Sequence, residues 1–149
     1  MACLYVVGTP IGNLGEVTPR APETFEKCDV ILAEDTRVTM KLLSALGIEG
    51  KRLISCYQHN EAGRARQIVQ KMLEEDLNVA MVTDAGTPCI SDPGNELIRA
   101  AIDAGIRVVG VPGCCAAVTA LSISGFDLST FFFFGFFPRE AADPRRALA

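Results

Sequence analysis

Four short segments of this sequence concentrate the residue types that can bind or transform a small molecule. Each follows directly after a run of apolar residues, which places it at the end of a predicted strand. Glycine lets a backbone approach a ligand closely, and a carboxylate can accept a proton from a reacting group. The segments are Gly8-Thr9-Pro10-Ile11-Gly12-Asn13, Ala33-Glu34-Asp35-Thr36-Arg37, Thr83-Asp84-Ala85-Gly86-Thr87-Pro88 and Val111-Pro112-Gly113.

The acidic pair Glu34 and Asp35 ends the second apolar run, where dinucleotide-binding folds place a carboxylate on a ribose. The position alone is equally consistent with an adenosine-type cofactor and with a loop shaped by pairing to Arg37. The glycines of the first segment are interrupted by Pro10 and do not form G-x-G-x-x-G, and no Gly-Lys-Ser/Thr sequence follows. This argues against a nicotinamide-dependent oxidoreductase and against a P-loop.

Other kinds of catalytic site are disfavoured by what the sequence contains. His59 is the single histidine, and we interpret it as a solvated loop residue ahead of a helix. No G-x-S-x-G motif is present. The six cysteines lie in apolar segments without a C-x-x-C pair, which indicates buried, reduced thiols. We therefore expect no metal site.

Strands alternate with helices along the chain, which predicts an α/β fold with an open, mostly parallel sheet and helices on both faces. All four segments then share the carboxyl edge of the sheet, where ligands of such folds bind. The helix over residues 61–76 is expected to bury Ile68, Met72 and Leu73. The predicted strands cover residues 3–7, 30–32, 52–55, 77–82 and 108–109, and the other helices run from the N-cap Thr18 to Lys27, from Thr39 to Leu46 and from Pro93 to Ala104.

Composition and charge limit the class of protein. The chain has 149 residues, of which 49% are hydrophobic, so it can build a packed core. With 14 basic and 18 acidic residues it is not a simple cationic nucleic-acid-binding module, although local basic patches can still contact RNA. The N-terminus lacks a signal peptide and no run is long enough to span a membrane, so we expect a cytoplasmic protein. The candidate patches are Arg37, Lys41, Lys51 and Arg52, and Arg139, Arg145 and Arg146.

The last third of the chain indicates a second domain. Phe131 to Phe137 is predicted to be a strand of a new sheet, and Asp143-Pro144 is typical of a helix start, shortly before Ala149. We therefore expect an N-terminal α/β domain over residues 1–113. Residues 114–149 would form a linker helix and the beginning of a truncated C-terminal α/β domain that belongs to a longer protein.

The motifs together resemble the tetrapyrrole methylase superfamily. The resemblance rests on residues 4–14, 33–37 and 83–94 and extends along the whole chain. More narrowly, the chain is similar to the branch that methylates the 2′-hydroxyl of a cytidine in 16S rRNA of the small ribosomal subunit. The resemblance implies two α/β domains, a homodimer, and S-adenosyl-L-methionine held between the domains.

The resemblance also implies roles for particular residues. One departure concerns Cys114, which stands where the family usually has proline. At the acidic pair we expect Glu34 or Asp35 to accept the proton of the ribose hydroxyl and Arg37 to orient a phosphate. The alternatives are a corrin or porphyrin precursor methylase of the same superfamily and a non-catalytic nucleotide-binding module. The cofactor is expected against Pro10, Asp84, Ala85, Gly86, Thr87, Pro112 and Gly113.

Overall fold

The computed structural model describes residues 1–56 and 61–136. Two compact units make up the chain, Met1–Ala116 and Ala117–Ala149. The first unit contains all five strands of the described residues, together with the four motif segments. It is therefore the unit in which the candidate site lies.

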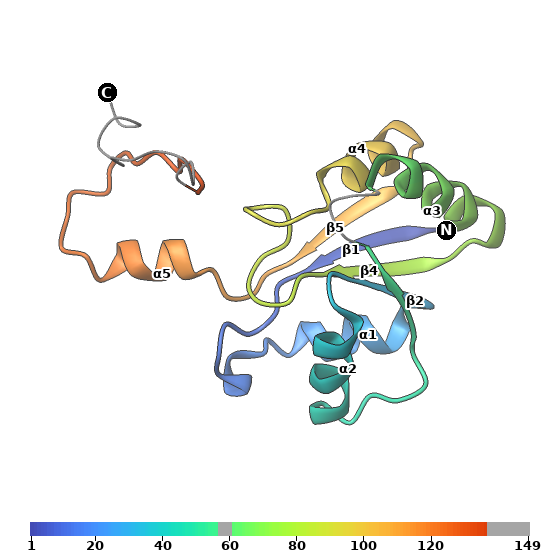
Figure 1. Ribbon diagram of the computed structural model, residues 1–149, viewed down its shortest axis with the longest axis horizontal. Helices are drawn as coiled ribbons and strands as arrows, with labels where there is room; N and C mark the ends of the chain where they lie inside the picture. Colours follow the sequence, from blue (N-terminus) through green and yellow to red (C-terminus); the bar gives the residue numbers. More distant parts are fainter. Residues whose placement is uncertain (57–60, 137–149) are drawn as a thin grey trace. The chain divides into compact units, whose positions relative to one another are not determined.

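The first unit is built on a five-stranded sheet in the order β3-β2-β4-β1-β5 (Figure 1). All neighbouring pairs are parallel, as predicted, and Leu4 of β1 is in register with Val79 on one side and Val108 on the other. The sheet therefore brings the ends of β1, β2, β4 and β5 to one edge. The strands are β1 Cys3–Val7, β2 Val30–Ala33, β3 Arg52–Ser55, β4 Asn78–Val82 and β5 Arg107–Val111.

Two helices cover each face of this sheet (Figure 1). The connections through α1 and α2 lead towards the β3 edge, whereas those through α3 and α4 lead towards the β5 edge. Because parallel crossovers are almost always right-handed, connections in opposite directions place their helices on opposite faces. The helices are α1 Arg20–Lys27, α2 Thr36–Ala45, α3 Glu61–Glu75 and α4 Asn95–Asp103, and a short 3-10 helix, η1, spans Leu14–Glu16.

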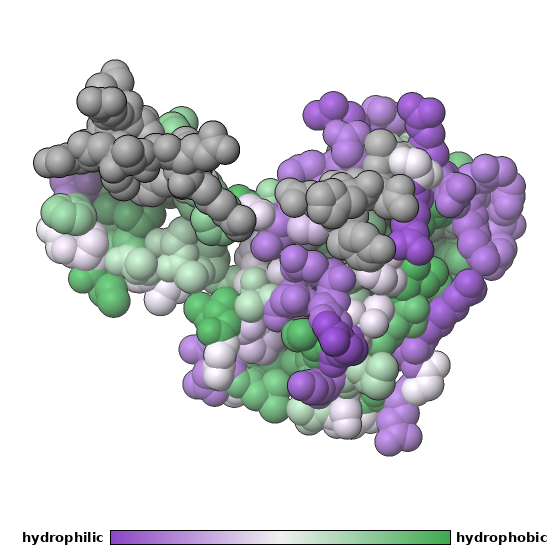
Figure 2. Space-filling model, viewed as in Figure 1, coloured by the Kyte–Doolittle hydropathy of each residue, from purple (hydrophilic) through white to green (hydrophobic). Residues whose placement is uncertain are grey.

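Each face of the sheet buries its own core. Leu4 packs into a cluster with Met72 and Leu97 under α3 and α4, while Val7 packs into another with Phe25 and Leu43 under α1 and α2. This alternation along β1 is the period of a strand buried on both sides. The hydrophilic surface in Figure 2 includes the outward side chains of the first unit's helices.

Three predicted helix starts were wrong: α4 begins at Asn95 instead of Pro93, and the other two errors concern the cap. The Asp35 side chain accepts a hydrogen bond from the Arg37 amide, which begins α2 at Thr36 instead of Thr39. Thr18 does not cap α1, because its hydroxyl donates to the carbonyl of Pro112 at 3.2 Å. A side chain that was expected to serve its own helix thus ties two distant segments together.

The buried face of α3 also differs from the prediction. Met72 is fully buried and Ile68 packs partly against the core, but Leu73 is 54% exposed. Ala65 and Val69 complete the buried face instead. These positions follow the i, i+4, i+7 spacing of one helical stripe, from which Leu73 is displaced by about 100°.

The second unit contains all of α5 (Ala116–Ser122) except its first residue, and an exposed phenylalanine segment. The prediction of a strand from residue 131 was wrong, since residues 131–136 have no strand. A strand needs a neighbour for its backbone hydrogen bonds, and the described residues of this unit include no strand to pair with. Hydrophobic side chains at the surface of this unit are visible in Figure 2. The predicted helix start at Asp143-Pro144 lies outside the described residues.

Candidate functional site

The loops that follow β1, β4 and β5 are joined into one structure, which we call the loop framework (residues 8–12, 83–87 and 111–114). Thr9 and Gly86 exchange two backbone hydrogen bonds of 2.9 and 3.1 Å. The hydroxyl of Thr87 donates to the carbonyl of Cys114 at 3.0 Å. These bonds hold three separate loops in one arrangement at the carboxyl edge of the sheet.

The closest approach in the loop framework is between Gly8 and Gly113. A Cβ atom added to either glycine would lie 2.7 Å from backbone atoms of the other. The amide of Gly8 donates to the carbonyl of Val111 at 3.1 Å, which fixes the two loops at this distance. The two positions require glycine because a side chain would collide with backbone that cannot move aside.

The loop after β4 has a second support beneath it. Gly94 has φ +133°, and a Cβ atom there would lie 2.7 Å from Cys89 Sγ and 2.8 Å from Met81 Cε. Gly86, within the loop itself, is buried and has φ +91°. Both glycines therefore adopt backbone conformations that other residues rarely adopt.

The residues predicted to hold a cofactor come together in this loop framework. Pro10 and Thr87 are half-buried and Gly86 is buried. The remaining four present polar backbone or carboxylate groups at the surface, namely Asp84, Ala85, Pro112 and Gly113. The structure thus places all seven on one edge, although their contacts with a ligand remain a prediction.

Beside the loop framework lies an acidic corner formed by Glu34, Asp35 and Asp84. The amide of Asp84 donates to Glu34 Oε2 at 3.3 Å, and the amide of Asp35 donates to Asp84 Oδ1 at 3.0 Å. This reciprocal pair of bonds joins the ends of β2 and β4. Three carboxylates are thereby held close together.

The two carboxylates of the predicted catalytic pair have different environments. Asp35 accepts a 2.6 Å hydrogen bond from the Arg37 guanidinium, and this contact lowers the pKa of Asp35 to about 2. Burial raises the pKa of Glu34 above its usual value, and the negative charge of Asp84 adds to the effect. A proton acceptor gains from a raised pKa, so the chemistry favours Glu34 in that role. Arg37 is already paired with Asp35.

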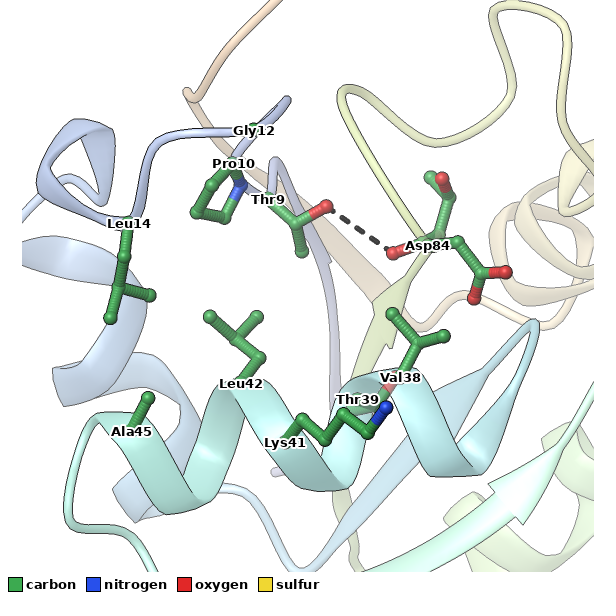
Figure 3. A pocket seen from close by; sticks show the side chains of 11 residues that line it. Thr9, Pro10, Gly12, Leu14, Val38, Thr39, Lys41, Leu42, Ala45 and Asp84 are labelled. Atoms are coloured by element: carbon green, nitrogen blue, oxygen red, sulfur yellow. Dashed lines mark hydrogen bonds between the residues drawn. The ribbon is translucent and has the colours of Figure 1, made fainter.

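A pocket of about 260 Å³ opens between the loop after β1 and helix α2 (Figure 3). Its walls are mostly apolar, and Figure 3 shows Leu14 and Ala45 at one end and Asp84 at the other. Lys41 reaches along it from α2. The lining residues are Thr9, Pro10, Gly12, Leu14, Val38, Thr39, Lys41, Leu42, Ala45, Thr83 and Asp84.

The sequence interpretation missed the part of this pocket that α2 supplies. The expected start at Thr39 left Val38 out of the helix, and the other residues fit an ordinary amphipathic pattern. The available signal is a second stripe, Val38, Leu42 and Ala45, at i, i+4 and i+7 beside the core residue Leu43.

Several further expectations can be compared with the described residues. Within 1–56 and 61–136, no three His, Cys, Asp or Glu side chains are grouped as a metal site, and no helix is long and apolar enough to cross a membrane. The six cysteines are thiols that form no disulfide, three of them buried and three half-buried. The basic patch is weakened because the Lys51 ammonium donates to the carbonyls of Glu26 and Cys28. His59 and the basic residues 139, 145 and 146 lie outside the described residues.

Comparison with known proteins relates this arrangement to one family. The family model for tetrapyrrole (corrin/porphyrin) methylases matches residues 3–148. A crystal structure of uroporphyrin-III C-methyltransferase from Thermus thermophilus aligns with 86% of this chain and 54% of its own, at a TM-score of 0.59 and 26% identity. The α/β fold is therefore the one found in methylases of this family.

The chain is more similar to proteins named ribosomal RNA small subunit methyltransferase I. The protein of that name from Neisseria meningitidis serogroup B is 49% identical over 98% of this chain and 50% of its own length. The one from Haemophilus influenzae is 51% identical over 93% of this chain and 48% of its own length. The chain thus spans about half the length of these relatives.

Proposed function

The chain belongs to the tetrapyrrole (corrin/porphyrin) methylase family, and on this premise we propose that it is part of an S-adenosyl-L-methionine-dependent RNA methyltransferase. Its substrate is the 2′-hydroxyl of a cytidine ribose in 16S rRNA of the small ribosomal subunit. The observation that carries this proposal is the identity of 49–51% to ribosomal RNA methyltransferases over nearly the whole chain. Identity to the uroporphyrin methyltransferase is 26%.

The loop framework fits the proposed cofactor. It presents backbone groups and the Asp84 carboxylate, which suit the amino, carboxylate and hydroxyl groups of an amino-acid nucleoside. The residues that would hold it are those of the sequence prediction, from Pro10 through the 84–87 loop to Pro112 and Gly113. When bound, S-adenosyl-L-methionine supplies a methyl group on a sulfonium, which is already a good leaving group.

The chain's own residues have two tasks in this proposal. The loop framework orients the reactants, and good alignment contributes roughly 7–11 kcal/mol to lowering a barrier. Glu34 accepts the proton of the ribose hydroxyl, supported by its raised pKa and its place beside Asp84. Asp35 holds Arg37 and the start of α2, and Arg37 remains our candidate for orienting a substrate phosphate.

The whole protein is further proposed to act as a homodimer, as the family resemblance implies, and to be located in the cytoplasm, as expected from the sequence pattern. A corrin or porphyrin precursor methylase is the second candidate, because the similar protein of known structure is named a uroporphyrin-III C-methyltransferase. A nucleotide-binding module without catalysis is the third. Neither of these two candidates predicts labelled RNA, and of the two only the precursor methylase predicts methyl transfer to a porphyrin precursor.

The experiment uses the protein at its full length, since this chain covers half of its relatives. It is incubated with labelled S-adenosyl-L-methionine and small ribosomal subunits from a strain that lacks the modification. Label in 16S rRNA at one alkali-resistant position supports 2′-O-methylation and identifies the nucleotide. Cofactor binding without RNA labelling contradicts the RNA proposal. Transfer to a porphyrin precursor would then support the second candidate.

A further inference from the structure

The pocket between helix α2 and the loop after β1 shares only Pro10 and Asp84 with the residues predicted to hold the cofactor. We propose that it binds the base of the target nucleotide, and that the Thr39 hydroxyl hydrogen-bonds to the edge of that base. The inference rests on the proposed function, which it deepens by naming the substrate subsite. Three independent features of the pocket support it: its place in the topology, its unpartnered hydroxyl, and its size and lining.

The topology places this pocket where α/β sheets bind ligands. The chain leaves β1 and β2 towards the face of α1 and α2, but leaves neighbouring β4 towards the face of α3 and α4. The chain therefore leaves β4 towards one face of the sheet and leaves both of its neighbours, β2 and β1, towards the other face. Such a switch between adjacent strands opens a crevice at their carboxyl ends. Thr83 and Asp84, which directly follow β4, line the pocket together with residues from the loop after β1 and from α2.

The Thr39 hydroxyl is the group in this pocket that most clearly needs a ligand. The residue is 2% exposed and lines the pocket (Figure 3). Among the described residues, Thr39 Oγ1 has no hydrogen-bond partner. Buried hydroxyls nearly always have one; the Thr24 hydroxyl, for example, donates to the carbonyl four residues earlier at 2.7 Å, whereas the Thr39 hydroxyl makes no such bond. A polar atom on the edge of a bound base would supply the missing partner.

Size and lining select a single flat ring as the occupant. A volume of about 260 Å³ is below the roughly 300–1,000 Å³ typical of drug-sized ligands, so it suits a single ring better than a four-ring macrocycle. Pro10, Val38 and Leu42 provide apolar surface for the faces of a ring. Lys41 can donate to ring acceptors, and Asp84 can accept from an exocyclic amino group such as that of cytosine.

The position of Asp84 links this pocket to the reacting centre. Asp84 lines the pocket and also accepts the Asp35 amide, while its own amide donates to Glu34 Oε2 at 3.3 Å. A base held in the pocket would therefore leave its ribose next to the acidic corner. Binding of the base and removal of the hydroxyl proton are thus assigned to adjacent parts of one edge.

The first test fills the pocket in the full-length protein. Ala45→Phe adds a ring at the exposed end of the pocket, while Ser44→Phe adds the same ring to the neighbouring exposed residue, which does not line it. We expect Ala45→Phe to lower kcat/KM for unmodified ribosomal subunits by about tenfold or more. The dissociation constant for S-adenosyl-L-methionine should stay at the wild-type value, and Ser44→Phe should keep wild-type kinetics.

The second test removes the hydroxyl while keeping the shape. Thr39→Val should raise the KM for ribosomal subunits by about two- to tenfold, which is the range for loss of one neutral hydrogen bond. The same substitution should raise the melting temperature of the free protein, because it removes a buried polar atom without a partner. Thr39→Ser, which keeps the hydroxyl, should have a KM closer to wild type than Thr39→Val.

The outcomes separate this inference from the proposed function. If the wild-type protein labels no RNA, the proposed function fails and the base pocket fails with it. If the wild type labels RNA but Ala45→Phe and Ser44→Phe have equal kcat/KM, the pocket inference alone is overturned. It is also overturned if Thr39→Val leaves the KM unchanged. A folded Ala45→Phe protein that binds cofactor and loses RNA kinetics supports it.

Discussion

The loop framework and the acidic corner occupy the same edge of the sheet but are held in different ways. The loop framework depends on backbone hydrogen bonds and on the direct approach of Gly8 to Gly113. The acidic corner depends on side-chain carboxylates, with Asp35 and Asp84 accepting backbone amides. Backbone contacts do not titrate, whereas carboxylate contacts do. One region therefore provides fixed geometry and the other provides groups whose charge can change during a reaction.

The largest expected effect concerns Glu34 in the acidic corner. In the full-length protein, Glu34→Gln should lower kcat for RNA methylation by about 10²–10⁴-fold, the usual contribution of a general base. Asp35→Asn should lower it by less than about tenfold, because Asp35 has a pKa of about 2 and is paired with Arg37. Single-turnover rates with labelled cofactor measure both variants.

A matched control for that comparison is the cofactor affinity of the two variants, which should equal that of the wild type. A Glu34→Gln enzyme with normal kcat would remove Glu34 from the proposed reaction. If Asp35→Asn lost activity to the same extent, the difference that we draw between the two carboxylates would be wrong.

The loop framework is tested by adding one methyl group at its closest contact. Gly8→Ala places Cβ 2.7 Å from Gly113 backbone and should lower the free energy of unfolding by about 1–3 kcal/mol. Gly110→Ala is the control, since Cβ at that strand position meets nothing within 4 Å. Urea denaturation of this chain measures both. Equal midpoints for the two variants would show that the loops can separate at little cost.

The difference between backbone and side-chain contacts also explains how much of the loop framework and of the acidic corner can be predicted from the sequence. Parallel strands bring their carboxyl ends together whatever the strand order, so the convergence of the Pro10, Asp84 and Pro112 segments follows from the alternation of strands and helices. The contact between Gly8 and Gly113 depends on β1 and β5 being neighbours. A single sequence does not give that order, because it results from packing of the whole sheet.

The parts that sequence interpretation missed depend on side chains with more than one available partner. Asp35 was expected to act in catalysis or to shape a loop, and it also caps α2, which moved the helix start. Thr18 is of a residue type that commonly caps helices, but its hydroxyl donates a hydrogen bond to the carbonyl of Pro112. Short polar side chains can satisfy local or distant backbone groups equally well, so their partners are decided by the tertiary structure.

Loss of the Asp35 cap on α2 should have a smaller effect on stability than the clash at Gly8, and it tests the acidic corner instead of the loop framework. Asp35→Ala removes the acceptor of the Arg37 amide and should lower the free energy of unfolding by about 1 kcal/mol. Asp35→Asn keeps a capping oxygen and should cost only a few tenths of that value. Thermal unfolding followed by circular dichroism distinguishes the two. Identical melting temperatures for the alanine and asparagine variants would mean that the cap contributes nothing.

The smallest expected effect is the pH dependence that Asp35 gives to stability. The pKa of Asp35 is about 2 in the folded protein and 3.8 in the unfolded chain. Between these two pH values the unfolded chain therefore binds more protons than the folded protein. The stabilisation from Asp35 is therefore complete above about pH 4 and is lost as the pH falls towards 2. Urea midpoints of the wild type should fall towards those of Asp35→Asn over this range and stay a constant distance above them at higher pH. The hydrogen bonds that Gly8, Thr9 and Gly86 make within the loop framework join backbone groups, which do not titrate, so the midpoint of Gly8→Ala should keep the same offset from wild type across the whole range. Parallel curves for wild type and Asp35→Asn down to pH 2 would show that the Arg37 contact does not bias the ionisation of Asp35, and the acidic corner would then be as insensitive to pH as the loop framework.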